Sequence, residues 1–92
     1  MKIVYNPEFE NRLIDIVDYI IQDKPSAGMN FAVGLEKSIL LLVQNPFQYR
    51  QSRYFEDENI RDMIYKGYTI VYEVNVKMDY IEILQIFNRN KP

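Results

Sequence analysis

The pattern of apolar positions in the first half of the chain predicts two helices. From residue 7 to 22, apolar side chains recur every three or four positions, as on one face of an amphipathic helix. Asn6-Pro7 supplies the residue types that favour the cap and the first turn of this helix. A second apolar stripe begins after Pro25 and stops at Asn45-Pro46, where proline disfavours further helix. Because the connection between the two helices is short, they must run antiparallel.

The remaining apolar pattern predicts four short strands. Residues 3–5 are β-branched or aromatic, and residues 60–66, 68–75 and 80–87 have the composition and partial alternation of strands. Lys66-Gly67 separates two of them as a hairpin turn. The predicted order is β-α-α-β-β-β, and the fold class is α+β. A helical hairpin should pack on one face of an antiparallel sheet formed mainly by the last three strands, whose order these patterns do not fix.

The predicted core combines the apolar faces of the helices and of the sheet. We expect the following side chains to be buried: Leu13, Ile16, Ile20, Phe31, Leu35, Ile39, Ile70, Tyr72, Ile83 and Ile86. Gly28 and Gly34 lie inside the second helix, where glycine costs about 1 kcal/mol relative to alanine. We interpret both as positions at which the two helices approach each other closely.

The composition removes several kinds of function. The chain has 92 residues, enough for one domain, and we expect residues 1–92 to form a single domain. Cysteine and histidine are both absent, which excludes thiolate zinc sites, a Ser-His-Asp triad and a histidine general base. The isolated glycines form no phosphate-binding loop, and Glu56-Asp57-Glu58 lacks the spacing of a calcium loop. The sequence therefore predicts no cofactor and no metal site.

The charge and hydropathy of the chain narrow its partners and its location. A net charge of −2 does not fit a domain that binds nucleic acid by tracking phosphates, since such domains are basic. There is no run of about 18 apolar residues, so no membrane-spanning segment is predicted. No export signal is recognisable, and together with the lack of cysteine this favours a cytoplasmic protein.

Residues 46–59 form a polar and aromatic stretch with little periodicity. A loop of this length is unusual in so small a domain, and such loops are often functional. Its aromatic residues Tyr49, Tyr54 and Phe55 stand near arginines, a combination that suits either stacking on nucleobases or contact with a protein. Because the chain is net negative, we favour a protein partner.

Four segments of the chain together carry a family pattern. They lie at the start of the first helix, in its body, at the end of the second helix and along the last three strands: Tyr5-Asn6-Pro7-Glu8-Phe9-Glu10, Asp15-Ile16-Val17-Asp18-Tyr19-Ile20, Leu42-Val43-Gln44-Asn45-Pro46, and Ile60-Arg61-Asp62 through Gly67-Tyr68-Thr69-Ile70-Val71-Tyr72-Glu73-Val74 to Ile83-Leu84-Gln85-Ile86-Phe87. In this order and spacing they resemble the RelE/ParE superfamily of bacterial type II toxins. The helix length and the segments around Arg61 and Tyr72 look more like the ParE branch than the RelE branch.

The resemblance implies a toxin with one of two mechanisms. ParE-like toxins are implicated in poisoning DNA gyrase, whereas RelE-like toxins are mRNA interferases that cut messages on the ribosome. Toxins of both branches are neutralised by a cognate antitoxin, whose flexible C-terminal segment wraps over the toxin. We therefore expect a ParE-like toxin that poisons gyrase. The alternatives are a RelE-like ribonuclease, with the ribosome and mRNA as its targets, and a nontoxic interaction module derived from a toxin.

The residues favour a toxin that is not an enzyme. RNA cleavage by attack of a 2′-hydroxyl needs a proton acceptor, cations around the phosphorane and a donor for the leaving oxygen. RelE-like enzymes take these groups from lysines, arginines and tyrosine or, in some branches, from histidine and glutamate. Here histidine is absent, and the strand of residues 68–75 carries no arginine or lysine. No catalytic residue is therefore assigned, and an enzymatic form of the protein would be an endoribonuclease.

The candidates for contact with the cellular target are four cations and one tyrosine: Arg53, Tyr54, Arg61, Arg89 and Lys91. In ParE-like toxins the corresponding end of the chain is basic and implicated in toxicity, often with a histidine and paired arginines. Here Asn88 stands near the histidine position, and the last two of these cations replace the pair. For Arg61 the alternative to a target contact is a structural role, in an ion pair with Glu56-Asp57-Glu58 or with Asp62.

The candidates for contact with an antitoxin are apolar or aromatic: Met63, Tyr65, Tyr49 and Phe55. One helical hairpin covers one face of a sheet, so apolar residues of the strand at 60–66 should remain on the other face. These are either Met63 and Tyr65 or Ile60 and Ile64. A bare apolar face favours aggregation. An antitoxin could cover it by adding a strand or by laying an amphipathic helix in a groove.

Overall fold

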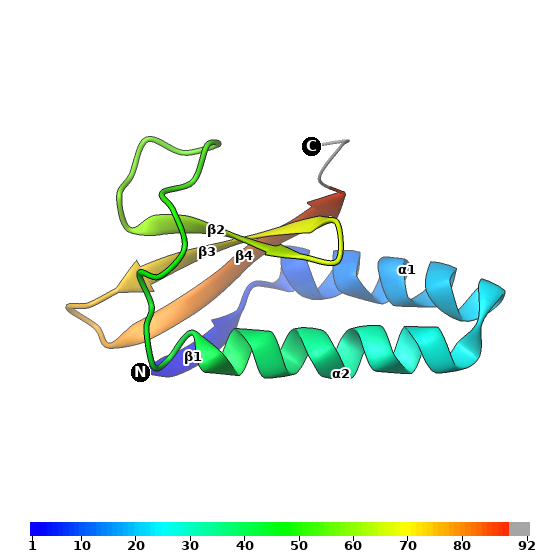
Figure 1. Ribbon diagram of the computed structural model, residues 1–92. Helices are drawn as coiled ribbons and strands as arrows, with labels where there is room; N and C mark the ends of the chain where they lie inside the picture. The colour runs from blue at the N-terminus through cyan, green and yellow to red at the C-terminus, as the bar shows by residue number, and fades with distance from the viewer. Residues whose placement is uncertain (89–92) are drawn as a thin grey trace.

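A computed structural model describes residues 1–88, which form two helices and four strands. The elements follow the predicted order β-α-α-β-β-β: β1 Lys2–Tyr5, α1 Pro7–Asp23, α2 Pro25–Leu41, β2 Ile60–Tyr65, β3 Tyr68–Asn75 and β4 Tyr80–Asn88 (Figure 1). The α+β fold class is confirmed. Within the described residues, neither helix is long and apolar enough to cross a bilayer.

The helix ends follow from local hydrogen bonding. At the start of α1, the side chain of Asn6 accepts a hydrogen bond from the backbone N–H of Glu8 at 2.9 Å, as the predicted cap requires. The second helix ends earlier than predicted, at Leu41. The backbone N–H groups of residues 42–45 each bond the carbonyl three positions earlier, so the chain tightens into turns before the proline is reached.

The strands form one sheet in the order β1-β4-β3-β2. The antiparallel arrangement predicted for the sheet holds for β2, β3 and β4, whereas β1 pairs parallel with β4, from Lys2 beside Tyr80 to Tyr5 beside Ile83. The sheet is therefore mixed. A parallel neighbour is reached by a long crossover and not by a hairpin turn, so no local sequence signal marks this pairing.

A bulge in β4 interrupts the regular alternation of apolar and polar residues along this strand. Tyr72 pairs with Ile83, while the residue before Tyr72 pairs with Gln85, which leaves Leu84 without a partner in the ladder. The extra residue reverses the alternation of the strand. Ile83 before the bulge and Ile86 after it consequently both face the helices, where they belong to the core.

The two helices cover one face of the sheet, and the core lies between these layers (Figure 1). Most of the predicted core residues are confirmed as buried: Ile16, Phe31, Leu35, Ile39, Ile70, Tyr72, Ile83 and Ile86. Leu13 and Ile20 are half-buried instead, because each lines a depression in the surface beside α1. Phe9, Leu42 and Met63 complete the same core cluster.

The two glycines of α2 serve different contacts. A Cβ atom added at Gly28 would overlap the side chain of Ile21, which confirms the predicted close approach of the helices. A Cβ atom added at Gly34 would overlap the hydroxyl of Tyr65, which comes from β2 and not from α1. That hydroxyl donates a hydrogen bond to the carbonyl of Phe31 at 2.9 Å. Gly34 therefore allows a strand side chain to reach the backbone of α2.

Candidate interaction surfaces

The segment of residues 42–59 leaves the helical layer and passes the end of the sheet to the side turned away from the helices, here named the open face (Figure 1). The hydroxyl of the buried Tyr72 donates a hydrogen bond to the carbonyl of Pro46 at 2.7 Å. Burial raises the pKa of this hydroxyl, an effect that the positive charge of Arg61 opposes. Gln51 forms a bridge with Arg61, so the segment also covers the outer edge of β2.

Arg61 holds this segment in place. Its Nη1 donates to the carbonyl of Tyr49 at 3.0 Å, and its Nε donates to the carbonyl of Glu58 at 2.8 Å. The guanidinium also lies 4.9 Å from the centre of the Phe47 ring. Within residues 1–88, Arg61 forms no ion pair with a carboxylate. The ion pair predicted for Arg61 is therefore not formed. Its guanidinium instead bonds backbone carbonyls, one of which belongs to the acidic stretch, and so is engaged within the protein.

Asp62 fixes the part of the loop that crosses the open face. Its side chain is buried, and its Oδ2 accepts a hydrogen bond from the backbone N–H of Arg53 at 3.0 Å. The backbone N–H of Asp62 donates to the carbonyl of Arg50 at 3.2 Å. Next to it, the hydroxyl of Ser52 accepts from the N–H of Tyr54 at 3.1 Å. These contacts hold the loop backbone while the side chains of Arg53 and Tyr54 remain exposed.

Tyr54 brings the loop to the end of β4. Its ring meets the ring of Phe87 edge on, with 5.1 Å between the centroids. Arg89 and Lys91 follow β4 in the sequence and lie outside the described residues. The structure therefore brings two of the predicted target contacts, Arg53 and Tyr54, close to the last residues of β4, and it places Arg61 elsewhere.

The four candidates for antitoxin contact do not form one surface. Met63 is 1% exposed and belongs to the core, because the alternation of β2 turns it toward the helices. Tyr65 has the same orientation and is half-buried, and Tyr49 packs against the core from the loop. Phe55 is exposed on the loop. Of the alternative pair in β2, Ile60 is buried, and Ile64 is exposed on the open face.

The open face of the sheet carries carboxylates. Alternation places Asp62 of β2, Glu73 of β3 and Glu82 of β4 on this face, with Glu73 directly opposite Glu82. Arg61, the only cation within these three strands over the described residues, points toward the helices with Met63. Strands β2 to β4 thus offer no cationic surface for a phosphate.

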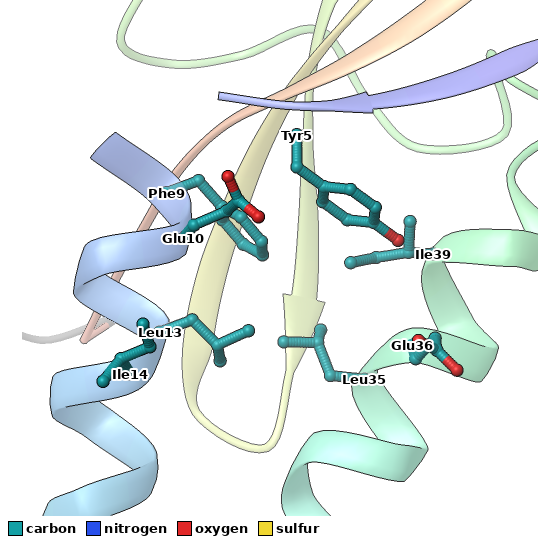
Figure 2. A pocket seen from close by; sticks show the side chains of 8 residues that line it. All are labelled: Tyr5, Phe9, Glu10, Leu13, Ile14, Leu35, Glu36 and Ile39. Atoms are coloured by element: carbon teal, nitrogen blue, oxygen red, sulfur yellow. The ribbon is translucent and has the colours of Figure 1, made fainter. Parts of the chain in front are cut away.

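Sequence reasoning missed a groove between the helices, here named the interhelical groove. It has a volume of about 270 Å³ and lies between the N-terminal half of α1 and the C-terminal half of α2. Figure 2 shows the side chain of Tyr5 reaching from β1 into the space between the helices, where the other lining residues are Phe9, Glu10, Leu13, Ile14, Leu35, Glu36 and Ile39. The one signal in the sequence is Ile14, which widens the apolar stripe of α1 beyond what the sheet can cover and is 57% exposed.

The rim of the interhelical groove is acidic. Glu10 from α1 and Glu36 from α2 are its charged lining residues, and both are exposed. Partial burial raises the pKa of the Tyr5 hydroxyl, and the negative charges of Glu36 and Glu10 raise it further. The negative charges of both carboxylates therefore act on the hydroxyl of Tyr5, which lies in the groove.

Comparisons with known proteins agree with this architecture. The model of the family described as the ParE toxin of the type II toxin–antitoxin system parDE matches residues 3–91. A chain from the solved chromosomal ParDE toxin–antitoxin system of P. aeruginosa is similar in fold, with a TM-score of 0.75 and 19% sequence identity over 96% of this chain and 95% of that chain. Among curated proteins, no significant sequence match is found.

Proposed function

The chain belongs to the family of ParE toxins of type II toxin–antitoxin systems, and we propose that it poisons DNA gyrase and is held inactive by a cognate antitoxin. The observation that carries this proposal is the family match, which extends over residues 3–91. Gyrase poisoning is the activity in which ParE-like toxins are implicated. Since gyrase acts on the bacterial chromosome, the place of action would be the cytoplasm.

The charges on the sheet support gyrase over messenger RNA as the target. An endoribonuclease stabilises the phosphorane with surrounding cations. Within the described residues, the open face carries the carboxylates of Glu73 and Glu82 beside the buried Asp62, and the guanidinium of Arg61 is bound by carbonyl groups of the loop. A ribosome-dependent mRNA interferase and a nontoxic interaction module are the alternatives that the experiment must separate.

The surface proposed to contact gyrase comprises Arg53 and Tyr54 together with Arg89 and Lys91. Tyr54 packs on Phe87, so the loop lies next to the end of β4, and the two further cations follow that strand in the sequence. Exposed cations act on an anionic surface over about 8–10 Å at ordinary ionic strength. We therefore expect toxicity to depend on positive charge at this end of the sheet.

Controlled expression of the chain in bacteria tests the proposal. Loss of viability with filamentation and DNA-damage signalling is expected, and the purified chain should inhibit supercoiling or trap cleaved DNA in a gyrase assay. Rapid loss of messages with arrested translation would instead identify a ribonuclease. Normal growth at a verified level of folded protein would identify a nontoxic module.

Removal of residues 89–92 tests the proposed contact surface. The deletion begins after Asn88, because Asn88 is the last residue of β4 and pairs with Tyr68. Toxicity should fall sharply while the melting temperature changes little. The charge variant Arg89→Gln/Lys91→Gln should behave likewise, and the control Lys24→Gln/Lys77→Gln, with the same net charge, should kill like the parent. If the shortened chain folds and kills as well as the parent, Arg89 and Lys91 are not part of the active surface, and Arg53, Tyr54 and Arg61 become the residues to substitute.

A further inference from the structure

The contact between the loop and the open face is built from polar side chains. Within residues 1–88, the buried polar or charged side chains are those of Ser52, Asp62 and Thr69. Ser52 belongs to the loop, and strand alternation places Asp62 and Thr69 on the open face that the loop covers in part. Burial of a polar group costs free energy unless hydrogen bonds replace those to water. This choice of residues therefore favours a defined loop position over maximal stability.

Asp62 is the least favourable of these three side chains for stability. It is 2% exposed, and its Oδ2 accepts the hydrogen bond from the N–H of Arg53, whereas its Oδ1 has no hydrogen-bond partner among the described residues. No cation of the described chain forms an ion pair with it. A buried carboxylate in this state lowers stability, and an apolar side chain in its place is often neutral or stabilising. Proteins break such rules mainly at functional or strained sites.

The hydrogen bond of Asp62 lies where the loop turns away from the edge of β2. Just before it, the N–H of Ser52 donates to a backbone carbonyl of β2 at 2.7 Å, as in an added edge strand. Tyr54 directly follows Arg53, and its ring lies against Phe87 of β4, on the far side of β3 from β2. Between these two contacts, the bond to Asp62 joins the loop backbone to the sheet. The carboxylate therefore sets the direction in which the loop leaves β2.

We propose that Asp62 is a positioning residue for the contact with gyrase, whose carboxylate holds the loop backbone so that Arg53 and Tyr54 stand beside the end of β4. Asp62 is buried and does not touch the target itself, so it acts through these two exposed residues. This inference rests on the proposed function, which assigns both residues to the gyrase contact. It adds that the loop position is maintained at a cost in stability.

Two substitutions separate the acceptor of Asp62 from its charge. Asp62→Asn retains an acceptor oxygen for the N–H of Arg53, whereas Asp62→Leu has a similarly branched side chain without an acceptor. Both variants lose the same negative charge, so each is the charge control for the other. A difference between them reports the loss of the acceptor.

Amide hydrogen exchange of the isotope-labelled full chain, followed by NMR, measures the loop position without an assay of toxicity. Relative to the parent, the amide of Arg53 should exchange about tenfold faster in Asp62→Leu and within about twofold of the parent's rate in Asp62→Asn. The amide of Ser52 is the internal reference, because its acceptor is a backbone carbonyl that neither substitution removes. Cross-relaxation between the rings of Tyr54 and Phe87 should persist in Asp62→Asn and weaken in Asp62→Leu.

Stability and activity should respond differently to the loss of the acceptor. The melting temperature of Asp62→Leu should equal or exceed the parent's, since an apolar side chain replaces a buried carboxylate with an unpaired oxygen. The concentration of Asp62→Leu that half-inhibits DNA supercoiling by gyrase should nevertheless rise about tenfold, whereas that of Asp62→Asn should stay within about threefold of the parent's. A purely structural role would instead make inhibition fall in step with the melting temperature.

The inference is overturned by equal exchange rates at Arg53 in Asp62→Leu and Asp62→Asn, by a displaced loop that still inhibits gyrase like the parent, or by a melting temperature of Asp62→Leu well below the parent's. Failure of the proposed function is distinguishable from these results. A parent chain that does not inhibit gyrase would overturn gyrase poisoning, and the exchange at Arg53 would still decide whether Asp62 positions the loop.

Discussion

The two faces of the sheet are covered by different means. The helices cover one face with interlocking apolar side chains such as Leu35, Ile70 and Ile83, all 1% exposed or less. The loop covers part of the open face through a few polar contacts, chiefly those of Asp62, and Arg61 anchors the same loop from the other side of β2. Burial of apolar area is large and non-directional, whereas each hydrogen bond contributes little and depends on geometry. The first face should therefore set the stability of the protein, and the second should set the position of its exposed loop.

The substitution Leu35→Ala should have the largest effect on stability. Truncation of a fully buried leucine removes apolar contacts and leaves a cavity, so the free energy of unfolding should fall by about 2–5 kcal/mol. Urea denaturation measures this loss. The control Leu40→Ala, on the same helix at 53% exposure, should cost far less. A loss below about 0.5 kcal/mol for Leu35→Ala would mean that the helical layer does not dominate stability.

The substitution Gly34→Ala tests the contact between α2 and β2. The added methyl group meets the Tyr65 hydroxyl, and such overpacking should lower the free energy of unfolding by about 1–3 kcal/mol. Tyr65→Phe removes the hydroxyl that occupies this space. In the double variant, the cost of the alanine should largely disappear. Additive losses in a double-mutant cycle would contradict this explanation of the glycine.

The substitution Arg61→Ala should act mainly on the loop. It removes both hydrogen bonds to the loop carbonyls and the contact with Phe47, and we expect a loss of about 1–2 kcal/mol in the free energy of unfolding. Amide hydrogen exchange should accelerate at Ser52 and Arg53 more than in β3. Arg61→Lys should rescue little, because lysine cannot bond both carbonyls in the same planar geometry. Uniform acceleration across the sheet would show that Arg61 supports the whole fold.

The substitution Tyr72→Phe should have the smallest effect near neutral pH. It removes the hydrogen bond to Pro46, at a cost of about 1 kcal/mol. At alkaline pH the difference in the free energy of unfolding between the parent and the variant should narrow. Burial raises the pKa of Tyr72 in the folded protein, so its stabilising contribution is present below the ordinary tyrosine pKa of about 10 and is lost as pH rises above it. Urea denaturation of both proteins from pH 7 to 11 measures this, and a gap that widens with pH would contradict the prediction.

The sequence predicts the helical layer more completely than the open face for a physical reason. Apolar spacing is repeated over many residues, so the helix starts at Pro7 and Pro25 and the strand Tyr68–Asn75 could be placed closely. The partners of Arg61 are backbone carbonyls, which every residue possesses, and no sequence pattern marks the two that it uses. The role of Gly34 could not be predicted for a related reason, because the side chain that it accommodates, Tyr65, comes from a strand that is distant in sequence.

The candidate sites were harder to predict because they depend on how elements are placed relative to each other. The alternation along β2 did not decide whether Met63 faces the helices or the open face. Its packing in the core shows that it faces the helices and is buried. The interhelical groove needs the relative position of α1, α2 and Tyr5 of β1, which no single segment encodes. Arg53 and Tyr54 could be chosen from their residue types, but their proximity to the end of β4 depends on the contact with Phe87.

The parallel pairing of β1 with β4 has a consequence for synthesis on the ribosome. Residues 2–5 are translated well before residues 80–83, which are their partners in the sheet. Contacts so distant in sequence form late, because the intervening chain must first be ordered. The first strand therefore waits without its partner until residues 80–83 have been made and have left the ribosome. A toxin of this topology cannot complete its sheet while the chain between these two strands is still being synthesised.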